Sequence, residues 1–326
     1  APADRQSLLL LQRTPRVNLQ RQLKGDYGDF NELALRIKQA EELFLLIGPP
    51  GTGKTSYGLV NTLKEELLEP DTHIALMAYT NRAVDEICSK LTAEGIDYLR
   101  IGSSLSAAPA YRKQLLQTRV NDCGKLTEVR TLIERTRVFV GTTTAFNAQP
   151  ALFQLKQFDL AIIDEASQLL EPHLIGLLSA CANGKPAIRK IVLIGDHKQL
   201  PAVVQQEAED ALVTDPLLQI IGLTDCRQSL FERSLKQYRH DPSVTYLLTK
   251  QGRMHQAIAA FPNRFFYQGR LEEVPLPHQQ RPLPTMPNGL NGQQQLLATR
   301  RVAFVEVPLP EESPSDKVNA IEAEMI

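Results

Sequence analysis

The chain contains 326 residues, a length that favours two domains because single domains commonly hold about 100–200 residues. Apolar residues make up 43% of the sequence and charged residues 22%, which permits a large core and excludes global disorder. The net charge of −1 excludes a uniformly basic, histone-like binder. It still allows a local basic groove, since nucleic-acid contact needs a patch and not a basic average.

Cysteines and histidines are few and scattered. The 4 cysteines form no CxxC pair and the 6 histidines form no HxxxH pair, so we expect neither a disulfide scaffold nor a zinc ribbon. Reduced thiols predict a cytoplasmic protein. No apolar run approaches the ~20 residues that a membrane span needs. The first residue is Ala1 and not methionine, from which we expect a piece of a longer protein.

Five short apolar runs, rich in Ile, Val and Leu, predict strands that are buried on both faces of a parallel sheet. Polar or glycine residues follow each run, and open α/β sheets bind ligands beyond the carboxyl ends of their strands. Helical stretches lie between the runs, so the predicted fold class is α/β. The predicted strands are residues 43–47, 74–78, 138–140, 160–163 and 191–194.

Two later segments have a different composition. Residues 100–137 carry eight basic and three acidic side chains and predict a small, mostly helical insertion. Its charge fits a nucleic-acid-facing patch and a solvated helical surface equally. The last eighty residues are rich in proline, which lacks the backbone donor of a central strand and therefore predicts surface loops. A strand over 302–307 is possible between the loops. The prolines concerned are Pro275, Pro277, Pro282, Pro284, Pro287, Pro308, Pro310 and Pro314.

Residues 48–55 read GPPGTGKT and fit the phosphate-loop (Walker A) pattern G-x-x-x-x-G-K-[ST], between a predicted strand and a predicted helix. Glycines let the backbone turn around the phosphates, and the following helix presents its positive end to the anion. Lys54 is expected to reach the β- and γ-phosphates, and the Thr55 hydroxyl to ligate Mg²⁺. The candidate nucleotide-binding residues are Gly48, Pro49, Pro50, Gly51, Thr52, Gly53, Lys54 and Thr55.

Two more polar segments follow predicted strands. In DEASQ (164–168), one carboxylate can hold Mg²⁺ while its neighbour polarises the attacking water, and we assign Asp164 to the metal and Glu165 to the base. Adjacent carboxylates repel, so Mg²⁺ and Lys54 are needed to keep both ionised. In GDHKQLP (195–201), the amide of Gln199 can donate and accept, which suits the γ-phosphate and the attacking water.

The order of these segments resembles that of superfamily 1 helicases, which are P-loop proteins with a RecA-like core. The matching segments are GPPGTGKT, YTNRAVDEI (79–87), DEASQ, GDHKQLPAVV (195–204), SLFER (229–233) and QGRMH (251–255). The full DEASQ and the QLP segment resemble the 5′→3′ branch, which includes the nonsense-mediated-decay RNA helicase and the Okazaki-fragment nuclease-helicase. The resemblance covers about residues 43–270. It implies two RecA-like domains with ATP in the cleft and a single strand across the top.

The resemblance also implies roles for single residues. Arg253 would come from the second RecA-like domain as an arginine finger that stabilises charge on the transferring phosphoryl group. Gly252 stands where the family more often has tyrosine, and no clear adenine-reading glutamine precedes the phosphate loop. The implied catalytic residues are Lys54, Glu165, Gln199 and Arg253, and the implied contacts to the nucleic-acid backbone are Thr80, Asn81, Thr142 and Thr143.

The expected organisation is an N-terminal segment (1–40), a first RecA-like domain (41–245) and the start of a second, truncated one (246–326), because later family motifs are absent. The expected function is an ATP-dependent DNA helicase or translocase core that uses Mg²⁺ and moves along single-stranded nucleic acid. DNA is favoured over RNA as the partner. An RNA helicase of the same family and a nucleotide-gated protein-interaction ATPase without translocation remain open alternatives.

Overall fold

The computed structural model describes residues 1–283, 289, 292–304, 306, 319 and 321. The chain forms two compact units, residues 1–251 and 252–326. The boundary falls after Gln251 and not after residue 245, because strand β9 (Thr245–Leu247) pairs with β1 (Leu43–Ile47) in the sheet of the first unit. Among the described residues, every helix is too short or too polar to cross a membrane.

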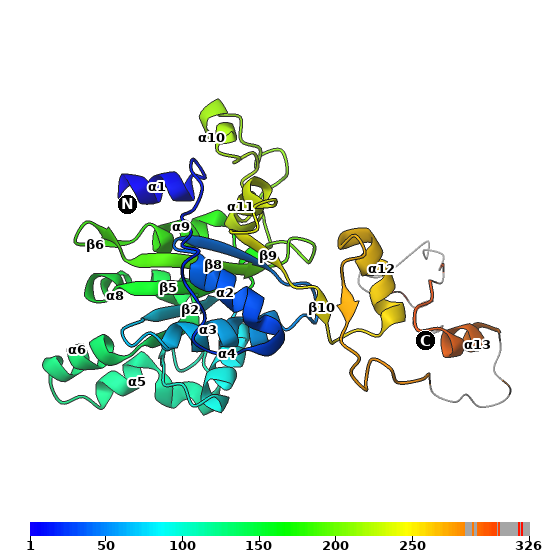
Figure 1. Ribbon diagram of the computed structural model, residues 1–326, viewed down its shortest axis with the longest axis horizontal. Coiled ribbons are helices and arrows are strands. Elements are labelled where there is room, and N and C mark those ends of the chain that lie inside the picture. The colour runs from blue at the N-terminus through cyan, green and yellow to red at the C-terminus, as the bar shows by residue number, and fades with distance from the viewer. Residues whose placement is uncertain (284–288, 290–291, 305, 307–318, 320, 322–326) are drawn as a thin grey trace. The chain divides into compact units, whose positions relative to one another are not determined.

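A seven-stranded, fully parallel sheet forms the centre of the first unit, in the order β3-β4-β2-β5-β8-β1-β9 (Figure 1). All five predicted strands are confirmed, and with them the α/β class. Two three-residue strands, β3 and β9, were not predicted. The remaining strands of this sheet are β2 (Ile74–Ala78), β3 (Leu99–Ile101), β4 (Val138–Thr142), β5 (Phe158–Ile163) and β8 (Ile188–Gly195).

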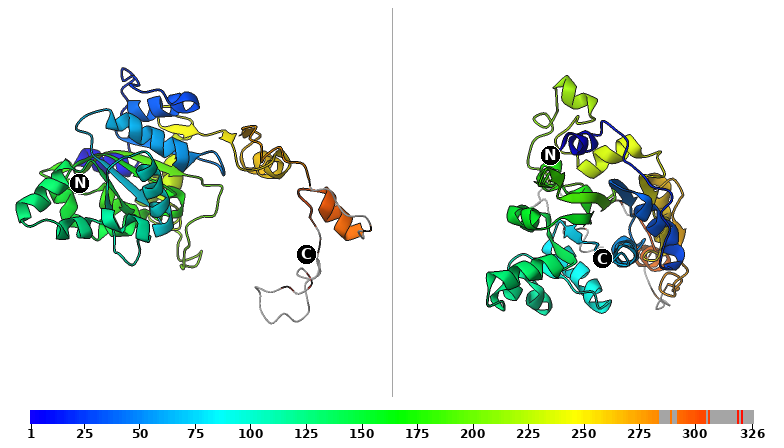
Figure 2. Two further views of the ribbon diagram at one scale, coloured as in Figure 1. Left: turned by 90° about the horizontal axis from the view of Figure 1, so that it is seen from below. Right: turned by 60° about the vertical axis from the view of Figure 1, so that its left-hand side comes forward.

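Helices cover both faces of this sheet, as the views of Figure 2 show. Along β1, Phe44 and Leu46 enter one apolar cluster, while Leu43 and Leu45 enter the other, as the alternation of side chains along a strand requires. The helices of the first unit are α1 (Ala3–Leu9), α2 (Asn31–Gln39), α3 (Val60–Leu67), α4 (Asn81–Ala93), α5 (Leu116–Asn121), α6 (Leu126–Arg135), α7 (Thr143–Asn147), α8 (Pro150–Leu155), α9 (Glu171–Leu178), α10 (Pro216–Ile220) and α11 (Leu230–Tyr238). An antiparallel pair, β6 (Cys181–Ala182) and β7 (Lys185–Pro186), precedes β8.

Residues 1–40 belong to the first unit and do not stand apart from it. Leu8 and Leu9 of α1 are buried in the cluster on one face of the sheet. Leu33 and Ile37 of α2 are buried in the cluster on the other face. The apolar spacing within these two helices therefore attaches the N-terminal segment to the same core as the phosphate loop.

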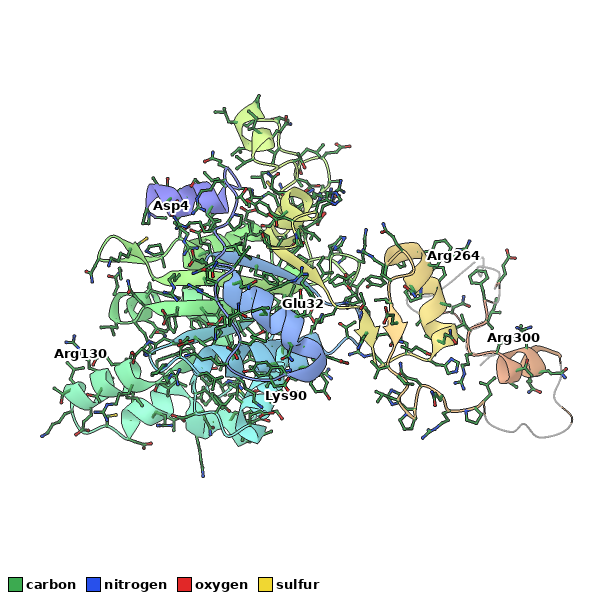
Figure 3. All side chains as sticks on the ribbon, viewed as in Figure 1. Asp4, Glu32, Lys90, Arg130, Arg264 and Arg300 are labelled. Atoms are coloured by element: carbon green, nitrogen blue, oxygen red, sulfur yellow. The ribbon has the colours of Figure 1, made fainter. Side chains whose placement is uncertain are left out.

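The basic insertion is helical, as expected, and contains α5, α6 and the 3₁₀ segment η3 (Pro109–Gln114). Its exposed basic charge is smaller than the sequence suggested. Arg100 lies in β3, is 1% exposed and pairs with Asp85. Arg137 donates to the carbonyl oxygens of Leu67 and Thr72. Arg130, by contrast, lies on the surface of α6 (Figure 3).

The second unit contains α12 (Gln256–Phe266), β11 (Glu272–Glu273) and α13 (Gly292–Thr299). Loops are confirmed around Pro275, Pro277 and Pro282. The described part of the expected strand over 302–307, residues 302–304 and 306, is not a strand. The rest of that stretch and five of the prolines, Pro284, Pro287, Pro308, Pro310 and Pro314, lie outside the described residues.

Candidate functional site

The five predicted polar segments follow strands that are neighbours in the sheet, and all five strands run in the same direction. Ile47 pairs in register with Gly195, and Met77 with Ile163. Ala78 pairs with Thr142 at the ends of β2 and β4. The loops that carry GPPGTGKT, GDHKQLP, DEASQ, YTN and GTT therefore emerge along one edge of the sheet.

The phosphate loop owes its path to glycine. Gly51 and Gly53 have φ angles of 76° and 75°, a conformation that costs other residues free energy. A Cβ atom on Gly48 would lie 2.7 Å from the Cβ of Lys54, so no side chain fits there without a shift. The N–H of Gly48 donates to the carbonyl of Gly195 at 3.0 Å. A π-helical turn, η2 (Lys54–Leu59), continues into α3 and begins the predicted helix.

Two side-chain pairs join the phosphate loop to the end of β5. The Nζ of Lys54 lies 2.8 Å from Oε1 of Glu165, and the pair is partly exposed. The hydroxyl of Thr55 donates to Oδ2 of Asp164 at 2.8 Å. Glu165 has a φ angle of 54°, and this left-handed turn directly follows the buried strand. Residues that are about 110 positions apart in sequence are thus brought together as predicted.

Asp164 is a buried carboxyl group whose pKa is raised by its surroundings. It is 2% exposed, and its burial raises the pKa of its carboxyl to about 6, although the hydroxyl of Thr55 and the charge of Lys54 act against that rise. A buried carboxylate beside a hydroxyl is the hard-oxygen donor set that Mg²⁺ prefers. Among the described residues, no group of three His, Cys, Asp or Glu side chains could hold a metal. Asp164 and Thr55 could hold Mg²⁺ together with phosphate oxygens and water, and this role stays a prediction.

The side chain of Gln199 is held by a residue that the sequence analysis did not single out. Its amide N–H donates to Oδ2 of Asp196 at 2.8 Å. The backbone N–H of Asp196 donates to Oγ of Ser167 at 3.1 Å, and a Cβ on Gly195 would lie 2.9 Å from the backbone nitrogen of Ser167. The DEASQ and GDHKQ loops are therefore interlocked. The only feature of the sequence that pointed to Asp196 and Ser167 was their position inside the GDHKQLP and DEASQ motifs.

The predicted nucleic-acid contacts follow β2 and β4. Thr80 caps α4 by accepting from the N–H of Ala83, and Thr142 caps α7 in the same way. Both caps leave the hydroxyl proton available to a phosphate oxygen. Thr80 and Asn81 are exposed, and Thr142 is partly exposed. Thr143 is the first residue of α7 and is 1% exposed, so its burial argues against the predicted contact to nucleic acid.

Arg253 belongs to the second unit, and its role as an arginine finger stays a prediction. Its neighbour Gly252, where tyrosine is more usual, lies against a close side chain: a Cβ there would be 3.0 Å from Cδ1 of Leu276. The amide of Gln279 donates to the carbonyl of Met254 at 2.9 Å. The segment around Arg253 is thus tied to the loop of residues 276–279.

Two family models, each described as an AAA domain, match the chain: one over residues 31–128 and 125–207, the other over 226–326. The first includes the phosphate loop, DEASQ and GDHKQLP; the second includes SLFER and QGRMH. The chain therefore belongs to the AAA-domain family of superfamily 1 helicases, on the branch that the sequence motifs indicated.

Particular relatives support the same grouping. The chain is 31% identical over 262 residues to the DNA replication ATP-dependent helicase/nuclease JHS1 of Arabidopsis thaliana, which covers 80% of this chain and 18% of the relative. It is 32% identical over 252 residues to DNA replication ATP-dependent helicase/nuclease DNA2 of Homo sapiens, covering 77% and 21%. It is 30% identical to DNA polymerase alpha-associated DNA helicase A of Schizosaccharomyces pombe, covering 79% and 43%. The chain thus spans about a fifth of the first two relatives.

Proposed function

We propose that this chain is the motor core of an ATP-dependent DNA helicase or translocase. The observation that carries the proposal is the pairing of Lys54 with Glu165 and of Thr55 with Asp164, at 2.8 Å in both cases. One pair supplies a cation and a candidate base. The other supplies a hydroxyl and a buried carboxylate. These four groups, next to a glycine-rich loop, are what cleavage of a bound triphosphate by water requires.

In this proposal, the backbone of residues 48–53 and the ammonium of Lys54 bind the phosphates of ATP. Glu165 accepts a proton from the attacking water, and Gln199 orients that water and the γ-phosphate. Asp164 and Thr55 hold Mg²⁺, which when bound neutralises charge on the phosphates. Arg253 adds positive charge from the second unit. Because Glu165 is paired with Lys54 in this structure, a phosphate oxygen that binds the ammonium would compete with this carboxylate and make the base more available.

Thr80, Asn81 and Thr142 are the proposed contacts to the backbone of a single strand. Hydroxyl and amide groups at helix N-termini suit phosphate oxygens and read no base, so binding should depend on salt and little on sequence. DNA is favoured over RNA because the matched relatives are named as DNA helicases. A cytoplasmic site of action is kept as a proposal from the unpaired state of all four cysteines.

The test is the steady-state ATPase rate of the protein as the cell makes it, measured while single-stranded DNA is titrated and then single-stranded RNA of the same sequence. We expect the rate to increase with DNA and to saturate. A rate that stays flat over the titration contradicts the motor and favours a nucleotide-gated interaction module. Stimulation by RNA alone contradicts the assignment to DNA.

A further inference from the structure

The segment between GDHKQLP and SLFER is an acidic stretch of the first unit that the proposed function leaves unused. Between Lys198 and Arg227 there is no basic residue. We call residues 205–226 the acidic arm. Its five carboxylates are Glu207, Glu209, Asp210, Asp215 and Asp225. A surface of this sign repels the phosphate backbone, so the arm is not part of a nucleic-acid path.

The arm is an ordered structure with its own internal bonds. Leu212 and Asp225 form an antiparallel bridge that closes its base, and Ala211 beside them is fully buried. Helix α10 forms its outer end (Figure 1). The carboxylate of Asp215 caps this helix by accepting from the N–H of Leu217 at 2.8 Å.

The end of α10 is fixed to the core by an arginine. Arg233 of α11 is 2% exposed and donates to the carbonyl of Ile221 at 2.9 Å. The same guanidinium pairs with Glu171 of α9. An element held in this way presents its outer surface in a fixed geometry.

That outer surface is apolar. On α10, Leu217 is 74% exposed, Ile220 is 80% exposed and Leu218 is also exposed. Apolar side chains gathered on an ordered projection are typical of a protein-interaction site. A single exposed leucine would need no explanation, but three exposed apolar side chains on one five-residue helix do.

We propose that the acidic arm binds a partner protein through a cationic amphipathic helix of that partner. The apolar face of such a helix would cover Leu217 and Ile220, while its lysines or arginines would lie near Glu207, Glu209 and Asp210. Asp225 is neutralised by Arg227, but the arm holds no basic residue beside Glu207, Glu209 and Asp210. Charge complementarity at these three carboxylates therefore selects a cationic occupant. Helix-in-groove and helix-on-patch contacts of this kind use apolar anchors one turn apart.

The test is fluorescence anisotropy of a labelled amphipathic Leu/Lys peptide of about 18 residues, or five helical turns, titrated with the chain. A peptide of the same composition in scrambled order is the control for charge alone. We expect the ordered peptide to bind at least about tenfold more tightly than the scrambled one, and its affinity to fall with salt.

Variants can show whether the peptide binds at the acidic arm or elsewhere on the surface. Leu217→Ser with Ile220→Ser should weaken binding of the ordered peptide at least about tenfold, and Glu207→Gln with Glu209→Gln should reduce its salt dependence. Leu105→Ser, at a residue that is 96% exposed elsewhere on the unit, should leave binding unchanged. Because all these side chains are exposed, the variants should fold.

Three results would overturn the proposal: no binding of the ordered peptide, equal binding of both peptides, or binding that the Leu217/Ile220 variant leaves intact. Sedimentation of the chain alone measures its oligomeric state and tests for a fourth result that would overturn the proposal. If the chain self-associates, and the same variant makes it monomeric while the peptide does not compete, then the occupant of the arm is a second copy of this chain and not a cationic helix. ATPase activity enters none of these readouts, so they are independent of the proposed function.

Discussion

Lys54 and Glu165 neutralise each other across 2.8 Å, so the cation of the phosphate loop and the candidate base are each other's partner in this structure. In the proposed function, a phosphate oxygen of ATP would compete with the carboxylate of Glu165 for the ammonium of Lys54 and weaken this ion pair. Nucleotide binding is therefore expected to make the candidate base more available.

Lys54→Ala should lower the ATPase rate by at least roughly 100-fold, because it removes the charge that stabilises the phosphates during transfer. The ion pair is partly exposed, so its loss should cost no more than about 1 kcal/mol of folding free energy. Lys64→Ala is the matched control, since Lys64 of α3 forms an exposed pair with Glu94 at the end of α4. Equal ATPase rates in the two variants would exclude the role given to Lys54.

Glu165→Gln should keep ATP binding and lower hydrolysis by at least roughly 100-fold, because glutamine retains an oxygen for Lys54 but accepts no proton. Binding is measured with a fluorescent nucleotide and turnover by phosphate release. If the variant hydrolyses ATP at the original rate, Glu165 is not the general base and another residue has that role.

Asp196 should act as a positioning residue for Gln199, because its carboxylate accepts a hydrogen bond from the amide of Gln199 at 2.8 Å. Asp196→Ala frees that amide and should lower kcat while KM for ATP changes little. Asp196→Asn keeps an acceptor oxygen and should restore most of the rate. If both variants lose activity equally, the carboxylate charge matters more than the hydrogen bond.

Arg233 should be a large contributor to stability, since it is 2% exposed and joins Glu171 to the carbonyl oxygens of Leu9 and Ile221. Arg233→Met leaves Glu171 without its partner and should reduce the free energy of unfolding by about 3–5 kcal/mol, measured by urea denaturation. Arg130→Ala, which breaks the exposed pair with Glu134, should cost about 0.5 kcal/mol or less. Similar losses in both variants would contradict this assignment.

The burial of Lys156 predicts a pH dependence of stability in the alkaline range. Burial lowers the pKa of its ammonium to about 8, although the nearby charges of Glu134 and Asp159 act against that fall. The ammonium donates to the carbonyl oxygens of Ile133 and Glu134 at 2.8 Å. Between about pH 8 and pH 10.5 the unfolded chain holds a proton that the folded chain has lost, so folding becomes more favourable as the pH rises.

The measurement for Lys156 is the free energy of unfolding of the original chain and of Lys156→Met through that pH range. The difference between them should shift in favour of the lysine form by up to roughly 3 kcal/mol as the pH rises. A difference that is independent of pH would show that Lys156 keeps its charge when folded.

Much of the fold and site followed from local patterns. Buried parallel strands are continuous apolar runs, which is why 43–47 and 74–78 match β1 and β2 residue for residue. Strand β3 was not predicted because its three residues include Arg100, whose charge is neutralised by Asp85 from α4. That pairing depends on tertiary contact, which the sequence does not display.

In the candidate site too, local sequence patterns predict some features, while others depend on tertiary contacts. The motif residues Lys54, Thr55, Asp164 and Glu165 meet as predicted, since each follows a strand of one parallel sheet. Thr143 has the same residue type as its neighbour Thr142, yet it is buried, and two adjacent threonines in a sequence do not reveal that difference. The support of Gln199 by Asp196 likewise depends on how one loop folds back on itself.

The order of strands in the central sheet sets a distance that the motor has to bridge. From β1, which leads into the phosphate loop, β2 is three strands away through β8 and β5. At about 4.8 Å per strand, the ends of β1 and β2 lie ~14 Å apart along the sheet edge. In the proposed function, the phosphate loop and the strand contact at Thr80 are separated by this distance, so the effect of ATP cleavage has to pass through the loops between them. These are the loops after β5 and β8, which the hydrogen bond from Asp196 to Ser167 joins.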